Sequence, residues 1–425
     1  MSVNPQSKLF RDPLHGYISI GDDLLPIIDS REFQRLRRVS QLGVSRLTYH
    51  GAEHTRFGHS VGVYYLYKRL ATELDRRGAP LAQDDLMAGL SAALLHDIGH
   101  GPFSHALEGI LTPGRNHETW TQEIVTGPTQ VNEALKTVDE ALPEKVCNIL
   151  KEGSCSSVLT SLISSQLDAD RMDYLLRDSM YCGVSYGRFD VDRLIATIVP
   201  HGSSPFIAID GRGLMAVEGY VLARYFMYWQ VYYHKTTRGF ECILRELWRY
   251  ARNKYQNGNL AEQDVPRQIR PFFQEAVTLD DYLNIDDYDI ISALKLWQAS
   301  EDPVLRDMST RFLRRHRFKS IEFNVNLHFD VQDRIKKVLE RYNYTEFQCY
   351  MIFDQPSSVA YDYYTAGEEG EKPPILIIDK NGSATEVSKL SEPIKALAGR
   401  SKNRFNLYVP EECVLEVESI IRAGR

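Results

Sequence analysis

The sequence has few cysteines, no long apolar run and no excess of basic residues. Its six cysteines are scattered and none forms a CxxC pair, which argues against a disulfide framework or a thiolate metal site and favours reduced, buried thiols. No stretch reaches the roughly 20 apolar residues that a membrane helix needs. The first residues, MSVNPQSKLFRDP, lack the apolar segment of a signal peptide. We therefore expect a cytoplasmic protein without a membrane partner.

The charge balance is mildly acidic. With 50 Lys and Arg against 57 Asp and Glu, the formal net charge is -7. Sequence-independent binding to nucleic acid depends on a basic surface, so this balance argues against it. A role on single strands would depend on the basic run between residues 311 and 319, which we interpret as a solvated helix face. A nucleotide pocket needs only a few local Arg and Lys and stays compatible with the charge.

The length and composition indicate an ordered globular protein with more than one core. The chain has 425 residues, of which 43% are hydrophobic and 25% charged. The sequence becomes predominantly polar near residues 256–265 (QNGNLAEQDV). We expect a mainly α fold, with a helical catalytic core over residues 1–255. A helical extension and a smaller C-terminal α+β lobe would occupy residues 256–425.

Local patterns predict the elements of both parts. Residues 8–20 indicate strand or loop with a turn at Pro13 and Gly16. Asp84 and Asp85 are a plausible N-cap for the helix that ends at the HD dipeptide. Beyond residue 318, strands are predicted at 321–329, 348–353 and 374–379, with helices between them. Helical spacing of apolar residues is found at 31–41, 59–77, 84–96, 117–126, 157–181, 218–254, 287–299 and 303–315.

Histidines gather in the first quarter of the chain. Eight of the twelve lie before residue 118, and the densest stretch is HDIGHGPFSH at 96–105. His59 lies upstream, and Asp170 follows in DADRMDY at 168–174. His59, His96, Asp97 and Asp170 together offer two imidazoles and two carboxylates. This mixed set suits Fe, Mn, Zn or Mg better than a structural zinc, which favours thiolates.

These motifs resemble those of the HD-domain phosphohydrolases and, within them, the deoxynucleoside triphosphate triphosphohydrolases. The likeness is greatest to the SAM-and-HD-domain dNTPase and its bacterial relatives, and it covers about the first 250 residues in order. No SAM domain is expected, because the HD motifs begin near the N-terminus. The resemblance depends on RDPLHG (11–16), FQRLRRVSQLG (33–43), HTRFGHSVGV (54–63), LLHDIGHGPFSHALE (94–108), DADRMDYLLRD (168–178) and VYYHK (231–235).

The resemblance implies a reaction in which a dNTP and water give a deoxynucleoside and triphosphate. It makes His59, His96, Asp97 and Asp170 the ligands of a divalent cation. Such chemistry needs charge neutralisation at the α-phosphorus, a positioned water and a proton for the departing 5′ oxygen. The family pattern makes His105 the acid, with its ring oriented by Glu108. His100 and His117 are implied as further phosphate contacts or acid–base groups.

The resemblance also implies a substrate site. Phosphates would be bound by basic residues and the deoxyribose by an apolar and aromatic wall that excludes a ribose hydroxyl. Two positions depart from the family's best-known member, because Arg171 stands for Lys and Tyr233 for Gln, so the base preference stays open. The implied phosphate contacts are Arg56, Arg171, Arg224 and Lys235, and the implied sugar contacts are Gln41, Leu42, Tyr174, Asp178 and Tyr232.

A second set of positions resembles the family's regulatory nucleotide pocket. Asp29, Gln34 and Arg37 would read a guanine, and Lys8 and Arg11 would hold the phosphates of GTP or dGTP. An ordinary charged amphipathic helix over 31–40 is the alternative. In the family such pockets form between subunits, so the resemblance implies a homo-oligomer, a dimer or a tetramer.

Two other functions compete with this interpretation. The metal residues alone would serve an HD-domain phosphodiesterase or a nucleotidase that acts on another nucleotide. A non-enzymatic nucleotide sensor with a decayed site is the second alternative. Every expected metal and acid residue is present, which argues against the sensor.

Overall fold

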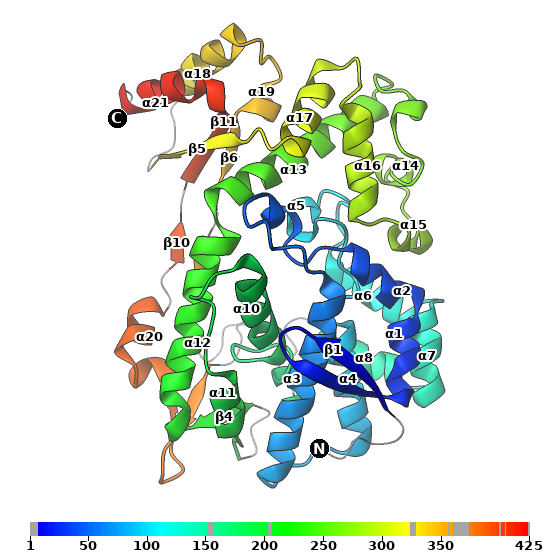
Figure 1. Ribbon diagram of the computed structural model, residues 1–425, viewed down its shortest axis with the longest axis vertical. Helices are drawn as coiled ribbons and strands as arrows, with labels where there is room; N and C mark the ends of the chain where they lie inside the picture. The colour runs from blue at the N-terminus through cyan, green and yellow to red at the C-terminus, as the bar shows by residue number, and fades with distance from the viewer. Residues whose placement is uncertain are drawn as a thin grey trace.

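The computed structural model describes residues 7–151, 157–202, 206–323, 329–355, 357–359, 374–398, 401–403 and 405–423. The fold is mainly α, with small sheets, as predicted (Figure 1). The part before residue 200 consists of β1 (Ser7–Asp12), β2 (Gly16–Gly21), α1 (Leu25–Asp29), α2 (Arg31–Arg35), α3 (Arg56–Arg76), α4 (Gln83–Leu95), α5 (Ser104–Leu107), α6 (His117–Thr126), α7 (Gln130–Val138), α8 (Leu142–Leu150), α9 (Val158–Ser161), α10 (Ala169–Cys182), α11 (Val191–Thr197) and β3 (Ile198–Pro200).

The remainder alternates long helices with short strands. It consists of β4 (Ile207–Asp210), α12 (Leu214–Met227), the π-helical turn η5 (Tyr228–Tyr232), α13 (Lys235–Gln256), α14 (Arg270–Phe273), α15 (Leu279–Leu283), α16 (Asp287–Trp297), α17 (Pro303–Leu313), β5 (Phe318–Phe323), α18 (Phe329–Arg341), α19 (Phe347–Tyr350), β6 (Ile352–Asp354), β7 (Ser357–Val359), β8 (Leu376–Ile378), β9 (Ala384–Glu386), α20 (Glu392–Leu397), β10 (Ser401–Asn403), β11 (Phe405–Pro410) and α21 (Val414–Ala423).

The C-terminal strands belong to three sheets, and in one of them β7 and β10 pair, among the described residues, only with each other. Strands β5, β11 and β6 form one sheet with β11 in the middle. Strand β8 instead pairs in parallel with β4, within the order β3-β4-β8-β9. The chain after residue 374 therefore returns to the helical core, where α20 lies beside α12 (Figure 1), before it enters the upper sheet.

Two clusters of buried side chains stabilise the fold. The first fills the space among α3, α4, α10 and α12 and includes Ile375, Ile377 and Ile394 from the returning segment. The second lies among α13, α16, α17 and β5. Helix α13 contributes its buried face to the second cluster, and Leu279 of α15 packs against both clusters. The division at residue 255 stays a prediction.

Several expected elements have different bounds. The expected helix 157–181 is two helices, α9 and α10, and the expected helix 218–254 is interrupted after η5. The N-cap of α4 is Ala82, with Asp84 and Asp85 in the first turn, where carboxylates favour the positive end of the helix dipole. Residues 347–350 form α19 rather than a strand, and Phe329 begins α18. The N-terminal hairpin and its turn agree with the prediction.

Candidate active site

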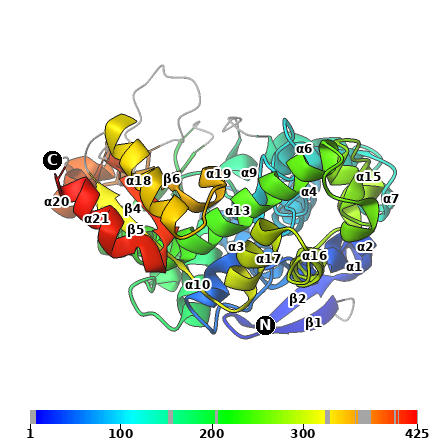
Figure 2. The same ribbon diagram turned by 90° about the horizontal axis from the view of Figure 1, so that it is seen from above.

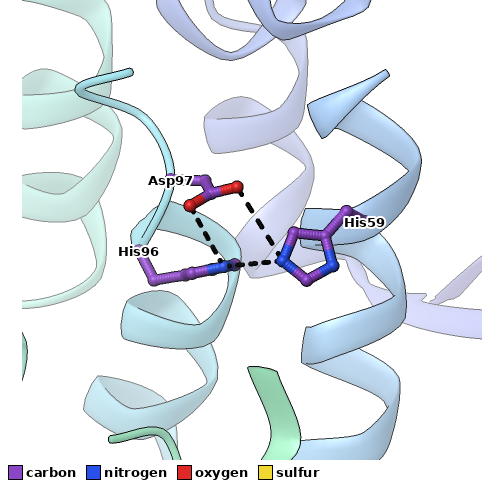
Figure 3. Close-up of side chains that lie close together, drawn as sticks. All are labelled: His59, His96 and Asp97. Atoms are coloured by element: carbon purple, nitrogen blue, oxygen red, sulfur yellow. Dashed lines mark hydrogen bonds and ion pairs between the residues drawn. The ribbon is translucent and has the colours of Figure 1, made fainter. Parts of the chain in front are cut away.

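Four side chains from three helical segments converge at the predicted metal site. His59 lies on α3, His96 and Asp97 directly follow α4, and Asp170 lies in the first turn of α10. His59 Nε2 is 3.1 Å from His96 Nε2 and 3.0 Å from Asp170 Oδ1. Asp97 Oδ2 lies 3.8 Å from His59 Nε2, and Asp97 Oδ1 lies 3.5 Å from His96 Nε2. Figure 3 shows the two imidazoles and the Asp97 carboxylate facing one another.

Both imidazoles are held with Nε2 toward the centre of the cluster. His59 Nδ1 lies 2.8 Å from the Asp173 carboxylate, and His96 Nδ1 lies 3.0 Å from the Ala93 carbonyl. Those oxygens only accept, so each Nδ1 carries a proton and the Nε2 lone pair of each ring is left for a cation or a second proton. Two lone pairs 3.1 Å apart repel unless a cation or a proton lies between them. The donor set therefore fits a divalent cation.

The electrostatics of the cluster favour positive charge. Although burial opposes protonation, the carboxylates of Asp170 and Asp173 raise the pKa of His59 to about 10. Burial likewise opposes the shift at His96, where Asp97 and Asp170 raise the pKa of the ring. Against the cost of burial, Arg56 and the imidazoles hold the pKa of Asp97 well below its ordinary value. The same carboxylates would stabilise a bound cation.

The loop after the HD dipeptide is held by close packing and by hydrogen bonds from other elements. Gly99 is required by close packing, because a Cβ there would lie 2.1 Å from the His117 carbonyl oxygen. Arg35 of α2 donates to the His100 carbonyl at 2.9 Å. Phe103 adopts a left-handed φ of 49°, and its backbone N–H donates to Asp287 of α16 at 2.9 Å. Such strain persists only where the surroundings hold the backbone in place.

A cavity of about 600 Å³ opens beside the cluster. This volume lies within the range of small-ligand sites. The lining combines the metal cluster, basic groups and aromatic rings. It is formed by Gln41, Leu42, Gly43, Ser45, Arg56, His59, His96, Asp97, His100, Phe103, Ser104, Ala106, His117, Asp170, Arg171, Tyr174, Asp178, Tyr228, Tyr232, Tyr233, Arg238 and Glu241.

The candidate acid–base groups occupy one end of this lining. The rings of His100 and His117 lie 4.1 Å apart, and Glu108 accepts a hydrogen bond from His117 Nδ1. Burial opposes protonation of His117, but Glu108 raises its pKa. Glu108 was expected to orient His105, and the contact that the structure describes is with His117. The side chain of His105 lies outside the described part of the chain.

The predicted sugar contacts come together on one wall. Gln41, Leu42, Tyr174, Asp178 and Tyr232 all line the cavity. Tyr232 Oη donates to Asp178 Oδ2 at 2.8 Å, and the rings of Tyr174 and Tyr232 lie 6.1 Å apart. The π-helical turn η5 is responsible for placing Tyr232 here.

His54, to which sequence reasoning assigned no role, contacts Asp178 of this wall. His54 Nε2 lies 2.7 Å from Asp178 Oδ1, and its ring stacks on Tyr181 at 4.4 Å. Its place two residues before Arg56 in a motif rich in histidine was the available signal.

Two of the four predicted phosphate contacts line the cavity and two do not. Arg56 and Arg171 line the cavity. Arg56 donates to Asp97 Oδ2 at 2.5 Å, and Arg171 pairs with Asp168. Arg224 and Lys235 are not among the lining residues, and Lys235 is exposed at the start of α13. The roles of all four stay predictions.

Helix α13 brings further groups to the cavity that sequence reasoning did not select. Arg238 and Glu241 line it from the first turns of this helix. Asp354 of β6 accepts from Arg238 Nε at 3.1 Å and from Nη2 at 2.6 Å. The cavity wall is thus tied to the C-terminal sheet. Charged residues on an amphipathic helix look the same in the sequence whether they line a cavity or face solvent, so the sequence alone could not select these two.

The predicted regulatory residues lie on the surface near the N-terminus. Lys8 and Arg11 are exposed on β1, and Asp29 is exposed at the end of α1. Arg37 Nε donates to Gln34 Oε1 at 2.9 Å. The Arg37 guanidinium also lies 3.5 Å from the centre of the Phe57 ring.

Two further surface expectations can be compared with the structure. Arg311 from the basic run is buried and pairs with Asp307 and Glu412, and Lys319 pairs with Glu411. These members of the run are neutralised rather than gathered on a free face. Among the described residues, no helix is both long enough and apolar enough to span a membrane.

Comparison with known proteins decides the family. Residues 56–178 match the HD domain, and residues 189–423 match the HD associated region. The chain belongs to the HD-domain family. As predicted, deoxynucleoside triphosphate triphosphohydrolases are among its homologues, which supports phosphohydrolase activity. The cluster of His59, His96 and Asp97 is the candidate metal site of this HD-domain protein.

The relatives of this HD-domain protein match either nearly the whole chain or only about half of it. The uncharacterized protein YwfO of Bacillus subtilis is 38% identical over 416 residues, which span 97% of this chain and 94% of that protein. Chicken deoxynucleoside triphosphate triphosphohydrolase SAMHD1 is 31% identical over 57% of this chain and 45% of that protein. A phosphohydrolase crystal structure from Bacteroides thetaiotaomicron superposes with a TM-score of 0.82 and 28% identity, covering 95% of this chain and 99% of that one.

Proposed function

We propose that this HD-domain protein hydrolyses deoxynucleoside triphosphates to deoxynucleoside and triphosphate. The observation that carries the proposal is that the metal cluster and the Asp178–Tyr232 wall line one and the same cavity of about 600 Å³. A metal centre alone would serve many phosphoesters, whereas a polar and aromatic wall beside it provides a place for a sugar. The similarity to vertebrate SAMHD1 over part of the chain supports the same substrate class.

In the proposed reaction water attacks the α-phosphorus and the bond to the 5′ oxygen breaks. A divalent cation (Fe, Mn, Mg or Zn) held by His59, His96, Asp97 and Asp170 would neutralise phosphate charge and lower the pKa of water. The departing 5′ oxygen takes a proton, for which His105 is the proposed acid. His117, whose pKa Glu108 raises against the effect of burial, would contact a phosphate oxygen or assist in the proton transfer. Triphosphate carries the new oxygen.

The basic residues would bind the phosphates. Arg56 and Arg171 lie in the lining, and the Nε groups of Arg171 and Arg224 are buried without hydrogen-bond partners among the described residues. A buried donor without a partner costs free energy that a phosphate oxygen can offset. Lys235 would contact the triphosphate from the start of α13.

The wall would recognise the deoxyribose. Gln41 Oε1 is a buried acceptor without a hydrogen-bond partner among the described residues. Asp178 is held by His54 and Tyr232, so its carboxylate has a fixed position. These acceptors would bind the 3′ hydroxyl, while Leu42 and Tyr174 would leave no room for a 2′ hydroxyl.

Product analysis tests this function. The purified protein is incubated with Mn²⁺ or Mg²⁺ and each dNTP, alone and in mixtures, in water enriched in ¹⁸O. Deoxynucleoside plus triphosphate, with the label in triphosphate, is expected. Monophosphate or diphosphate products, or cleavage of cyclic dinucleotides or short oligonucleotides alone, would instead establish a nucleotidase or a phosphodiesterase. The matching ribonucleotides should be turned over far more slowly.

Variants at the cluster give the matched control. His96→Ala and Asp97→Ala should abolish turnover and metal binding while the helical circular dichroism is retained. His50→Ala, at an exposed histidine, should leave both unchanged. Full activity of His96→Ala would refute the metal assignment.

We also propose regulation by a guanine nucleotide at the surface formed by Lys8, Arg11, Asp29, Gln34 and Arg37. These residues lie on neighbouring N-terminal elements and are exposed or half-buried. Binding there of GTP or dGTP between subunits would couple activation to a dimer or a tetramer. Turnover and molecular mass are measured with and without GTP. Asp29→Ala should lose the response and Asp75→Ala, at an exposed position of α3, should keep it; an unchanged response of Asp29→Ala would contradict the assignment.

A further inference from the structure

One sequence motif has no part in the proposed catalysis, although it lies next to the metal centre, and only its Arg11 has been given a role, in regulation. RDPLHG, at residues 11–16, forms the end of β1 and the turn into β2. Figures 1 and 2 both show this hairpin beside α3, the helix that carries His59. Asp12 and His15 from the turn are largely buried, with side-chain exposures of 6% each. Charged and polar groups buried in a surface turn need specific partners.

The partner of His15 is Asp173 of α10. His15 Nε2 donates to Asp173 Oδ1 at 2.6 Å, and His59 Nδ1 donates to Asp173 Oδ2 at 2.8 Å. Arg177, one turn further along α10, donates from Nε at 2.7 Å and from Nη2 at 3.0 Å to the same carboxylate. All acceptor positions of Asp173 are thereby occupied, so neither its charge nor its orientation is free to change.

Asp12 closes this network into a ring. Its Oδ2 accepts from Arg177 Nη1 at 2.9 Å. Its Oδ1 accepts from the backbone N–H groups of Leu14 and His15, both at 2.9 Å. One carboxylate therefore fixes the turn that presents His15 and also orients Arg177. Asp173 is then held from its own helix by Arg177 and from the hairpin by His15.

A glycine on the neighbouring helix leaves space for this network. Gly62 of α3 faces Asp173, and a Cβ at this position would lie 2.0 Å from Asp173 Oδ1 and 2.4 Å from Arg177 Nη2. The side chains of Asp173 and Arg177 are 0% and 2% exposed. Although burial opposes ionisation, Arg177 and the hydrogen bonds from His15 and His59 hold the pKa of Asp173 well below its ordinary value.

We propose that the N-terminal hairpin is a structural part of the metal centre, in which Asp12 and His15 hold Asp173 so that it orients His59 for the cation. Asp12, His15 and Asp173 are positioning residues, because none of them belongs to the four-residue metal cluster. The proposal rests on the metal site of the proposed function, but not on the identity of the substrate. It assigns a role to Asp12 and His15 of RDPLHG.

The test measures metal affinity rather than turnover. The full-length protein is freed of metal with a chelator, and free Mn²⁺ is followed by electron paramagnetic resonance during titration. His15→Ala is expected to weaken Mn²⁺ binding by about 10- to 100-fold, the usual effect of removing a group that orients a ligand. His15→Gln keeps a donor toward Asp173 and should bind within a few-fold of wild type. Asp12→Asn should also weaken binding.

The controls separate positioning from stability. His50→Ala removes an exposed histidine and should leave the affinity unchanged. Thermal unfolding of each metal-free variant shows whether the fold persists. A His15→Ala protein that unfolds at a lower temperature but binds Mn²⁺ like wild type would overturn the proposal, because the network would then only stabilise the fold. Equal weakening in His15→Gln and His15→Ala would also overturn it.

The failure of this proposal is distinguishable from failure of the proposed function. If His96→Ala loses Mn²⁺ while His15→Ala and Asp12→Asn retain it, only the role of the hairpin is wrong. If His96→Ala binds Mn²⁺ as tightly as wild type, the metal site is wrong, and both proposals fall.

Discussion

Two identical substitutions one helical turn apart on α3 should have opposite effects on stability. Gly62→Ala would place a Cβ 2.0 Å from Asp173 Oδ1 and 2.4 Å from Arg177 Nη2. Gly58→Ala would place a Cβ 3.5 Å from Arg177 Nη1, which is an ordinary contact. Both changes replace glycine by a better helix former, so the difference isolates the packing against α10.

The magnitude follows from the environment of Gly62. Overpacking a buried site costs about 1 to 3 kcal/mol. Displacement of the Asp173 carboxylate weakens charged hydrogen bonds from His15, His59 and Arg177, which adds about 1.5 to 3 kcal/mol. The helix propensity of alanine returns about 1 kcal/mol. We expect Gly62→Ala to lose about 2 to 5 kcal/mol of unfolding free energy and Gly58→Ala to change it by 0 to about +1 kcal/mol.

Urea unfolding of the metal-free proteins, followed by circular dichroism, measures the difference. Gly62→Ala should unfold at a clearly lower urea concentration than wild type, and Gly58→Ala at the same or a higher one. Equal stability of the two variants would refute the reasoning, because the close approach of α10 to Gly62 would then not exist.

Three further changes test other parts of the structure. Asp354→Ala leaves the Arg238 guanidinium without two hydrogen bonds, so it should destabilise the protein by about 3 kcal/mol in urea unfolding. Tyr232→Phe removes one donor from the carboxylate of the sugar wall, so kcat/KM for dNTPs should fall about tenfold. Glu108 raises the pKa of His117 against the effect of burial, so this pair stabilises the fold below pH about 6.5 and loses that contribution as pH rises through the raised pKa. Glu108→Gln should therefore destabilise the metal-free protein more at pH 6 than at pH 9.

Each of these expectations has a result that contradicts it. Asp333→Ala, at an exposed position of α18, is the control for Asp354→Ala, and equal stability of the two proteins would contradict the role of the Arg238 pair. An unchanged kcat/KM of Tyr232→Phe would remove the phenol from substrate recognition. A stability loss for Glu108→Gln that does not vary between pH 6 and pH 9 would show that its contact with His117 is not ionic.

The amino-acid sequence was enough to predict the residues of the candidate metal site and the class of the fold. His59, His96, Asp97 and Asp170 could be selected because few side-chain types bind a divalent cation and because they occur in recognisable motifs. The mainly α class follows from the spacing of apolar residues, which is a local property. The turn at Pro13 and Gly16 was predicted for the same reason, whereas its flanks, predicted as strand or loop, form the paired strands β1 and β2.

The groups that support this site could be identified only from the folded structure. The carboxylate of Asp173 acts on His59 from another helix, and His15 reaches it from a hairpin more than 150 residues away in the sequence. Arg238 lines the cavity because α13 follows the break after η5, and no Pro or Gly marks that break. Strand β8 returns to β4 through backbone pairing that side-chain patterns do not specify. Hydrogen bonds and packing between distant segments depend on how whole helices and strands pack together. The type of a metal ligand and the period of a helix, in contrast, can be recognised from short stretches of the sequence.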